Sequence, residues 1–249
     1  MSLTRPQTNP PRAGFLLPAV FVLALVALLL GCGGGGTSVE PVQAPAPVRV
    51  SFYGDSITSG AIKPPPGWLN PRPVARITEL AGGALQGVDW SLGGATVQDA
   101  RDGTPGMPFG PFAQAILADT SPVVVIRYAT ANALRFADRL SEYQRTLADM
   151  VAQARAAGKT VVLVGSTHIA EPMPGLSADD SRQVLANVDA FEAATRAVAA
   201  QCGVLFIDLR AVPFEGATDM ADDVHPSQQY SDRVSAHIAR ALVALLASP

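Results

Sequence analysis

The chain is predicted to form an α/β domain of three layers, α/β/α, around a five-stranded parallel sheet. Short apolar runs alternate along the sequence with longer segments of helical periodicity, and this alternation is typical of a parallel sheet covered by helices on both faces. Two of the runs, "PVVVIRY" at 122–128 and "TVVLVG" at 160–165, are apolar almost throughout, as in strands that are buried on both sides. The 249 residues are enough for one such domain.

The first half of the predicted domain opens on a run of alternating apolar and polar residues, the period expected of a strand. In order along the chain, we expect a strand at 48–53, a helix at 73–81, a strand at 87–91, a helix at 112–118 and the buried strand at 122–128. The helix at 73–81 is closed by Gly82-Gly83, a common stop signal.

The second half shows the stronger helical signals. A helix is expected at 141–157, where Tyr143, Leu147, Met150, Val151 and Ala154 fall on one stripe before Gly158. The buried strand at 160–165 follows. Ser177 with Asp180 predicts a capping box for a helix that runs to about Gln201. A last strand is expected at 204–208, and Ser227 is the expected cap of a final helix through Leu246.

The carboxyl ends of parallel strands meet at one edge of the sheet, and open α/β folds bind their ligands there. The first of these strand ends is followed by Gly54-Asp55-Ser56. Glycine permits a tight turn, which puts Ser56 at the N-terminus of a helix, where backbone N–H groups favour a developing negative charge. The alternative is that Ser56 is only the N-cap of that helix.

A second polar segment, "DDVHPS" at 222–227, precedes the last helix and therefore faces the same edge. A serine is a weak nucleophile unless a base removes its proton, and a histidine base needs a partner that fixes its tautomer. Asp222 and His225 are three residues apart, a spacing that brings a carboxylate to the imidazole Nδ1 within a turn. The alternative is a solvated acidic loop, because Asp219 and Asp223 lie close by.

Together the two segments resemble those of the SGNH (GDSL) hydrolase family, over residues 48–249. The first block is Gly54-Asp55-Ser56-Ile57-Thr58, the last is Asp222-Asp223-Val224-His225-Pro226, and "VDWSLGGATVQDA" at 88–100 resembles a block between them. The resemblance implies a flavodoxin-like fold and a hydrolase without metal or organic cofactor. It makes Ser56 the nucleophile, His225 the base and Asp222 its partner, with the N–H groups of Ser56 and Gly94 as oxyanion donors.

The third block departs from the family, which usually has Gly-x-Asn-Asp after the third strand. Here the sequence is "RYATANALR", residues 127–135. One register puts Ala131 at the position of the Asn. The other, favoured slightly because Asn132 is the nearby side chain with an amide to donate, gives Asn132 the oxyanion role. A third possibility is that no side-chain donor exists here.

Composition excludes some classes of function. Lys and Arg number 18 against 21 Asp and Glu, and no block of basic residues provides the electrostatic footprint of a nucleic-acid partner. The histidines outside the "DDVHPS" segment, His168 and His237, lack the spacing of metal ligands. Cys202 has no second cysteine in the domain, so no disulfide framework is expected. The oligomeric state is not indicated.

The N-terminal residues are predicted to be a targeting segment. Arg5 and Arg12 precede an apolar run at 15–30. Its ending, Leu29-Leu30-Gly31-Cys32, resembles the lipobox of bacterial lipoproteins, which implies a signal at 1–31 and a lipid on Cys32. A plain secretory signal or an uncleaved anchor is the alternative. The Gly- and Pro-rich residues 32–47 then form a tether, and several acyl chains would hold the protein firmly on a membrane.

We expect a serine esterase or acyl hydrolase that forms an acyl-enzyme on Ser56. The lipobox resemblance implies a lipid-anchored protein of the bacterial envelope, at the outer membrane or in the periplasm rather than at the cytoplasmic membrane, because Gly33 and not Asp follows the cysteine. Its substrate would be a small-molecule ester or an ester of an envelope glycan or lipid. One alternative is a tethered binding protein on the same fold, with the altered third block as its signature. Another is a flavodoxin-like binding module in which Ser56 only caps a helix.

Overall fold

The computed structural model describes residues 45–63, 67–173 and 175–248. The predicted signal at 1–31, the lipidated Cys32 and all but the last three residues of the tether lie outside these ranges. The first strand, β1, begins at Val48. Within the residues described, no helix has the length and apolarity needed to cross a membrane.

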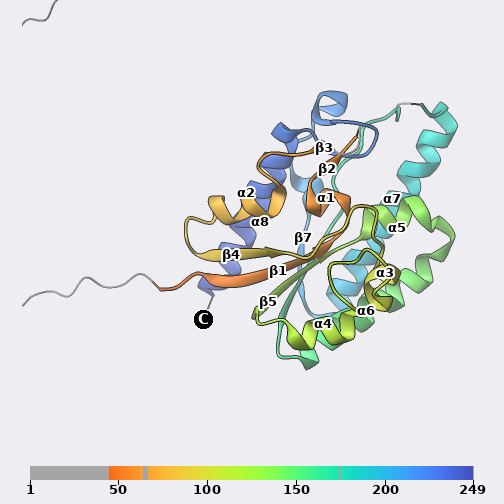
Figure 1. The fold of residues 1–249 in the computed structure, drawn as a ribbon. Helices are drawn as coiled ribbons and strands as arrows, with labels where there is room; N and C mark the ends of the chain where they lie inside the picture. The colour runs from red at the N-terminus through yellow and green to blue at the C-terminus, as the bar shows by residue number, and fades with distance from the viewer. Residues whose placement is uncertain (1–44, 64–66, 174, 249) are drawn as a thin grey trace, which may run out of the picture. The chain divides into compact units, whose positions relative to one another are not determined.

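The centre of the domain is one parallel sheet of five strands in the order β4-β1-β5-β6-β7 (Figure 1). The strands are β1 (Val48–Gly54), β4 (Leu85–Asp89), β5 (Val123–Arg127), β6 (Thr160–Val164) and β7 (Leu205–Ile207). From β1 the chain continues to β4 on one side and then to β5 on the other side. The carboxyl ends of β1 and β5 therefore flank the topological switch point, where such folds bind ligands. This confirms the predicted fold class.

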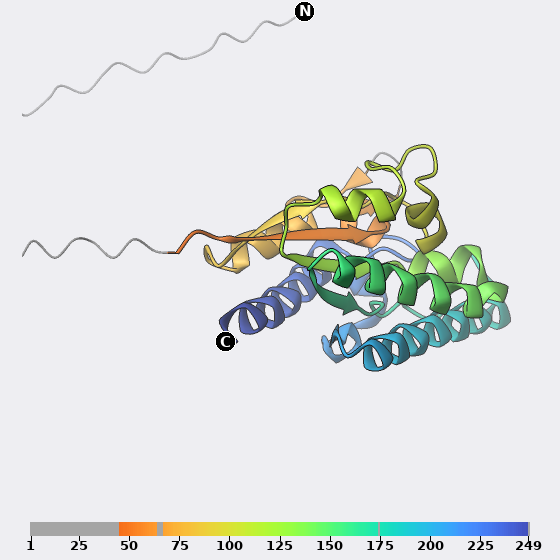
Figure 2. The ribbon, with the colours of Figure 1, turned by 90° about the horizontal axis from the view of Figure 1, so that it is seen from below.

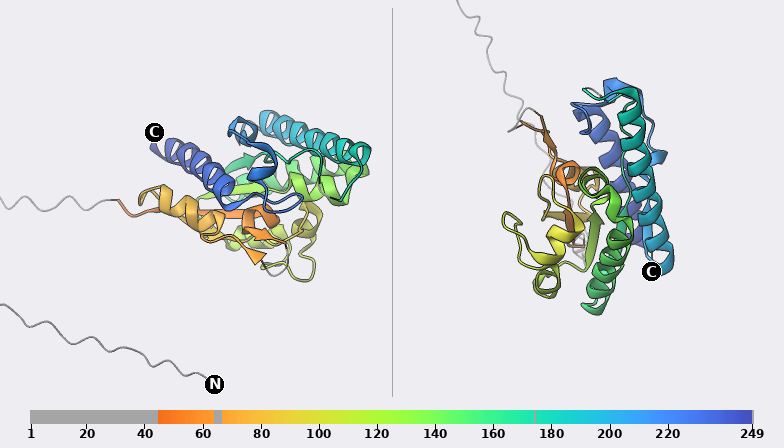
Figure 3. Two further views of the ribbon diagram at one scale, coloured as in Figure 1. Left: turned by 90° about the horizontal axis from the view of Figure 1, so that it is seen from above. Right: turned by 90° about the vertical axis from the view of Figure 1, so that its right-hand side faces the viewer.

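Helices cover both faces of the sheet, as the fully apolar strands require. α2 (Pro73–Leu80) and α8 (Gln228–Ala247) lie side by side on one face (Figure 3). The other face is covered by α3 (Val97–Asp102), α4 (Phe112–Ala118), α6 (Leu140–Ala156) and α7 (Ala178–Cys202). α6 and α7 run beside each other (Figure 2).

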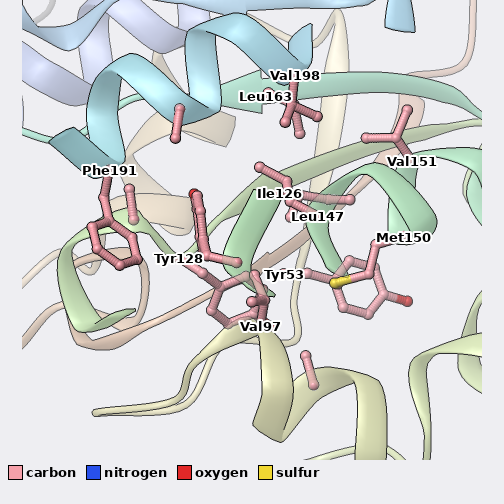
Figure 4. Packing of buried hydrophobic residues seen from close by; sticks show 14 of the residues in the cluster. Tyr53, Val97, Ile126, Tyr128, Leu147, Met150, Val151, Leu163, Phe191 and Val198 are labelled. Carbon is pink, nitrogen blue, oxygen red and sulfur yellow. The ribbon is translucent and has the colours of Figure 1, made fainter. Parts of the chain in front are cut away.

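The core is divided by the sheet into two clusters, because successive residues of a strand point to opposite faces. In β5, Val123 and Val125 pack towards α2 and α8, whereas Val124 and Ile126 pack towards α6 and α7. Figure 4 shows the second cluster, in which Tyr53 and Ile126 of the sheet meet side chains of α6 and α7. The two clusters pack the central strands from both faces.

The five strands of the main sheet and the helices α2, α4, α6, α7 and α8 agree with the sequence prediction, and α4 has the predicted bounds. β4 starts and ends two residues before the predicted 87–91. α1 (Ser56–Ser59) is the helix that was expected to begin at Ser56. The elements without a predicted counterpart are β2 (Ala61–Ile62), β3 (Gly67–Trp68), α3, α5 (Ala129–Arg135) and the 3-10 turns Ala137–Arg139, Leu209–Ala211 and Gly216–Asp219. Such short segments rarely show a full hydrophobic period, and two of them, β2 and α5, carry residues that line the site.

Candidate active site

The turn after β1 presents Ser56 at the start of α1. Asp55 is the N-cap of this helix, and its Oδ1 accepts the Ile57 N–H at 3.0 Å, so Ser56 is the first helical residue and not the cap. The close approach of the chain explains Gly54, because a Cβ there would come within 2.2 Å of Thr58 Oγ1. The Ser56 hydroxyl is therefore not the group that caps the helix.

The hydroxyl of Ser56 meets His225, as predicted. His225 Nε2 lies 2.9 Å from Ser56 Oγ, and His225 Nδ1 lies 2.8 and 2.9 Å from the two carboxylate oxygens of Asp222. An antiparallel bridge between Met220 and Pro226 closes the loop that carries the two residues. The Ala221 N–H also donates to the His225 carbonyl at 2.8 Å. The structure therefore brings all three residues of the predicted triad together, in hydrogen-bonding order.

Asp222 is held in its ionised form by its surroundings. Burial opposes the charge, but Oδ1 accepts the N–H groups of Val224 and His225 at 3.0 and 2.9 Å, and Oδ2 accepts the Lys63 N–H at 2.8 Å. These bonds and the imidazole hold the pKa of Asp222 well below its usual range. A carboxylate that stays charged orients the imidazole with Nδ1–H towards it and leaves Nε2 to accept the serine proton.

Two buried residues of opposite charge, Asp55 and Arg127, lie beneath the turn. Asp55 is fully buried, and its Oδ2 accepts the Ala131 N–H at 3.2 Å. Burial raises the pKa of this carboxyl, and the nearby charge of Arg127 opposes the rise. Arg127, at the end of β5, is buried as well and donates from Nε to the Gly165 carbonyl at 3.2 Å. The ends of β1, β5 and β6 are thereby tied together, a role for Arg127 that its place in an apolar run did not reveal.

A cavity of about 370 Å³ opens above the serine. Ser56, Gly94 and His225 form its polar wall, and Ile57, Ile62 and Leu134 contribute apolar surface. Gly94 has φ +74°, and a Cβ there would meet nothing within 4 Å. The glycine is therefore required for its left-handed backbone and not for lack of space. Ser56, His225 and the backbone of Gly94 thus lie at the wall of one largely apolar cleft.

Asn132 does not reach this cavity, so the structure does not support the register that gave it the oxyanion role. Its side chain is completely buried. Its Oδ1 accepts the Val97 N–H at 3.0 Å, and its Nδ2 donates to Gln98 Oε1 at 2.7 Å. Ala131 lines the cavity instead, with no side-chain donor. Successive residues of a helix point about 100° apart, and the step from Ala131 to Asn132 turns the amide away from the cavity and into the core.

The other candidate residues lie elsewhere. His168 stacks on Phe214 with a ring-to-ring distance of 5.1 Å and bonds the Arg210 carbonyl at 3.0 Å. His237 lies beside Arg240 on α8, at a separate surface hollow. Across residues 45–63, 67–173 and 175–248, no group of three or more His, Cys, Asp or Glu side chains is arranged to hold a metal ion.

Comparisons with known proteins give one family and one fold. A model of the GDSL-like lipase/acylhydrolase family matches residues 52–232. A search of curated proteins gives no match. Similar solved structures include the Mycobacterium smegmatis aryl esterase, with 17% identity, 80% of this chain and 99% of that chain covered and a TM-score of 0.64. Est24, a carbohydrate acetylesterase from Sinorhizobium meliloti, has 18% identity, the same coverage and a TM-score of 0.62. At these identities the structures show a shared fold.

Proposed function

The chain belongs to the GDSL-like lipase/acylhydrolase family and is an ester hydrolase, and on that premise we propose that it cleaves carboxylic esters through an acyl-enzyme formed on Ser56. The observation that carries the proposal is the unbroken series of hydrogen bonds from Ser56 through His225 to Asp222 at the wall of an apolar cavity. Each group has the partner that its role demands.

The first half of the reaction transfers the acyl group. His225 Nε2 takes the proton of Ser56 Oγ while this oxygen bonds to the carbonyl carbon, and the carbonyl π electrons move onto oxygen. The N–H groups of Ser56 and Gly94 donate to that oxyanion, and the charge of Asp222 stabilises the imidazolium. When the tetrahedral intermediate collapses, the C–O bond to the alcohol breaks, and the proton on Nε2 leaves with the alcohol.

The second half returns the enzyme to its starting state. A water molecule takes the place of the alcohol and gives a proton to His225 Nε2 as its oxygen attacks the acyl carbon. Collapse of the second intermediate breaks the bond to Ser56 Oγ, which regains the proton from the imidazolium. The carboxylic acid then leaves the cavity. All proton transfers pass through one nitrogen, which lies 2.9 Å from the nucleophile.

The substrate class follows from the cavity and from where the chain is expected to lie. The apolar lining of the cavity suits a short acyl chain. The solved structures that resemble this chain include proteins described as a carbohydrate acetylesterase and an aryl esterase. We propose a small-molecule ester or an ester of an envelope glycan or lipid. The lipid on Cys32 would anchor the enzyme in the bacterial envelope, and Cys32→Ala should release the protein from the membrane fraction of lysed cells.

Ala131 is the observation that favours a second candidate, a membrane-tethered binding protein on the same fold. Without an amide at this position the cavity has two backbone donors, and removing one donor typically lowers kcat by about 10²–10³. Such a protein would bind an ester-bearing ligand and turn it over slowly or not at all.

Hydrolysis of p-nitrophenyl acetate and butyrate by the purified chain separates the two candidates. We expect turnover that Ser56→Ala reduces to the rate of the buffer, while Ser91→Ala, a serine bonded to Asp89 at another strand end, keeps the parent rate. A fluorophosphonate should add to Ser56, as intact mass and peptide mapping would show. Equal rates for the parent and Ser56→Ala, together with no labelling, would leave the binding protein as the better description.

A further inference from the structure

Gly94 contributes its N–H to the proposed oxyanion hole, yet packing does not fix its conformation. Its φ is +74°, and the space where a Cβ would stand is open to 4 Å. The turn on either side is tied to the sheet, since the Leu92 N–H donates to the Gly54 carbonyl at 3.0 Å and the Ala95 N–H to the Leu92 carbonyl at 3.1 Å. The Ala95 N–H bond holds one side of the peptide that follows Gly94, and a bond to the Gly94 carbonyl would hold the other side and so limit rotation about Gly94.

Arg135 supplies that restraint. Its Nη1 donates to the Gly94 carbonyl at 2.7 Å and to Asp99 Oδ2 at 3.0 Å. Asp99 is itself fixed, because the same oxygen accepts the Thr96 N–H at 2.9 Å in the capping box that begins α3. The guanidinium carbon also lies 5.3 Å from the centre of the Phe136 ring. The Gly94 carbonyl is thus bonded by a side chain of α5 that is itself paired with a carboxylate of α3.

A second side chain of α5 holds the same segment from inside the protein. Asn132, three residues before Arg135 and therefore on the same face of the helix, accepts the Val97 N–H in the first turn of α3. The two side chains thus hold both ends of the 94–97 segment, Arg135 at the Gly94 carbonyl and Asn132 at the Val97 N–H. Asn132 does so in the core, whereas half of the Arg135 side chain is exposed and lines the catalytic cavity.

Arg135 is paired with Asp99, but it also has N–H donors at the cavity that this pair and the Gly94 carbonyl do not use. Three cavity-lining side chains in the described part of the chain carry N–H donors. The Lys63 ammonium is bound by both oxygens of Asp223 at 2.8 Å, and His225 is committed to Ser56 and Asp222. Arg135 uses one nitrogen for its contacts and remains a cation at the wall where the oxyanion forms.

We propose that Arg135 is a positioning residue of the oxyanion hole. By binding the Gly94 carbonyl and the Asp99 carboxylate, it directs the Gly94 N–H into the cavity and compensates for the missing amide at Ala131. The proposal rests on the proposed ester hydrolysis. It predicts that Arg135 acts on the chemical step through Gly94, and not on the binding of the substrate's ground state.

The test compares Arg135→Met, which has no donor, with Arg135→Lys and with Arg139→Met in the full chain. Arg139 is the matched control because it contacts the same Phe136 ring, at 4.8 Å, but does not line the cavity. We expect Arg135→Met to lower kcat for p-nitrophenyl butyrate by about 10- to 100-fold, less than removal of a donor itself. KM should change less than threefold, roughly, as for an interaction made in the transition state. Arg135→Lys should keep part of the rate, and Arg139→Met should match the parent.

Chemical rescue distinguishes positioning from a loss of fold. Methylguanidinium, added to Arg135→Ala below denaturing concentrations, should raise kcat and leave Arg139→Ala unchanged. The proposal is overturned if Arg135→Met keeps the parent kcat, or if only KM rises, which would make Arg135 a residue that binds the ground state of the substrate. A parent rate that does not depend on Ser56 would instead refute the proposed function, so the two failures are separable.

Discussion

The substitution Asp222→Asn removes one charge from the site and changes almost no volume. In the parent, both carboxylate oxygens accept backbone N–H groups, Oδ1 from Val224 and His225 and Oδ2 from Lys63. The amide of the variant has only one oxygen that can accept a hydrogen bond. In either orientation the new NH2 group therefore faces a backbone N–H. The imidazole loses both its charged partner and part of its orientation.

The size of the effect follows from the distance and the burial of the pair. The Asp222 and His225 side chains are 10% and 11% exposed, so bulk water screens them little. Opposite charges about 4 Å apart interact by about 4 kcal/mol at an effective dielectric constant of about 20. The imidazolium forms only as the reaction proceeds, so this energy is lost from the transition state. At about 1.4 kcal/mol for each factor of ten, kcat should fall by about 10³.

The assay is steady-state hydrolysis of p-nitrophenyl butyrate at neutral pH, with kcat and KM measured separately. Asp223→Asn is the control, because this neighbouring carboxylate bonds the exposed Lys63 ammonium and takes no part in the triad. We expect it to stay within a few-fold of the parent, as for other exposed ion pairs. A kcat for Asp222→Asn within tenfold of the parent, or an equal loss in both variants, would refute the reasoning.

Two further outcomes concern stability. Asn132→Ala leaves the Val97 N–H and the Gln98 amide without their buried partner, so urea unfolding should show a loss of about 2–3 kcal/mol; an unchanged midpoint with a large loss of kcat would return Asn132 to the oxyanion hole. The folded state lowers the pKa of Asp222, so its charged form stabilises the fold above the pKa of the unfolded chain, and this gain is lost as the pH falls below about 5. The Tm of the parent should therefore drop more between pH 6 and pH 3 than that of Asp222→Asn, and parallel curves would contradict the assignment.

The sequence predicted the features that depend on burial and on helix capping. The apolar runs at β5 and β6 were recognisable because both faces of these strands are covered. Ser177 and Ser227 cap α7 and α8 as expected, accepting the Asp180 and Tyr230 N–H groups. Ser56 and His225 are 169 positions apart in the sequence. Their proximity could be predicted because parallel strands place their carboxyl ends along one edge of the sheet.

The sequence could not decide which residue of the third block, 127–135, faces the site, and the reason is physical. The choice between Ala131 and Asn132 depends on the rotation of α5 about its axis, and one residue changes the direction of a side chain by about 100°. The phase is set by contacts made far along the chain, from Asp55 to the Ala131 N–H and from Asn132 to Val97. Sequence alone shows neither contact.

The same contacts limit what the site has for catalysis. The Ala131 N–H is taken by Asp55, so the backbone at this position offers no substitute for the missing amide. The proposed hole is then left with the N–H groups of Ser56 and Gly94, of which the first is fixed by α1. The second depends on a glycine in a left-handed conformation, held at its carbonyl by Arg135. Because donors act in proportion to how well they are preorganised, the restraint on Gly94 should weigh more here than in an enzyme with three donors.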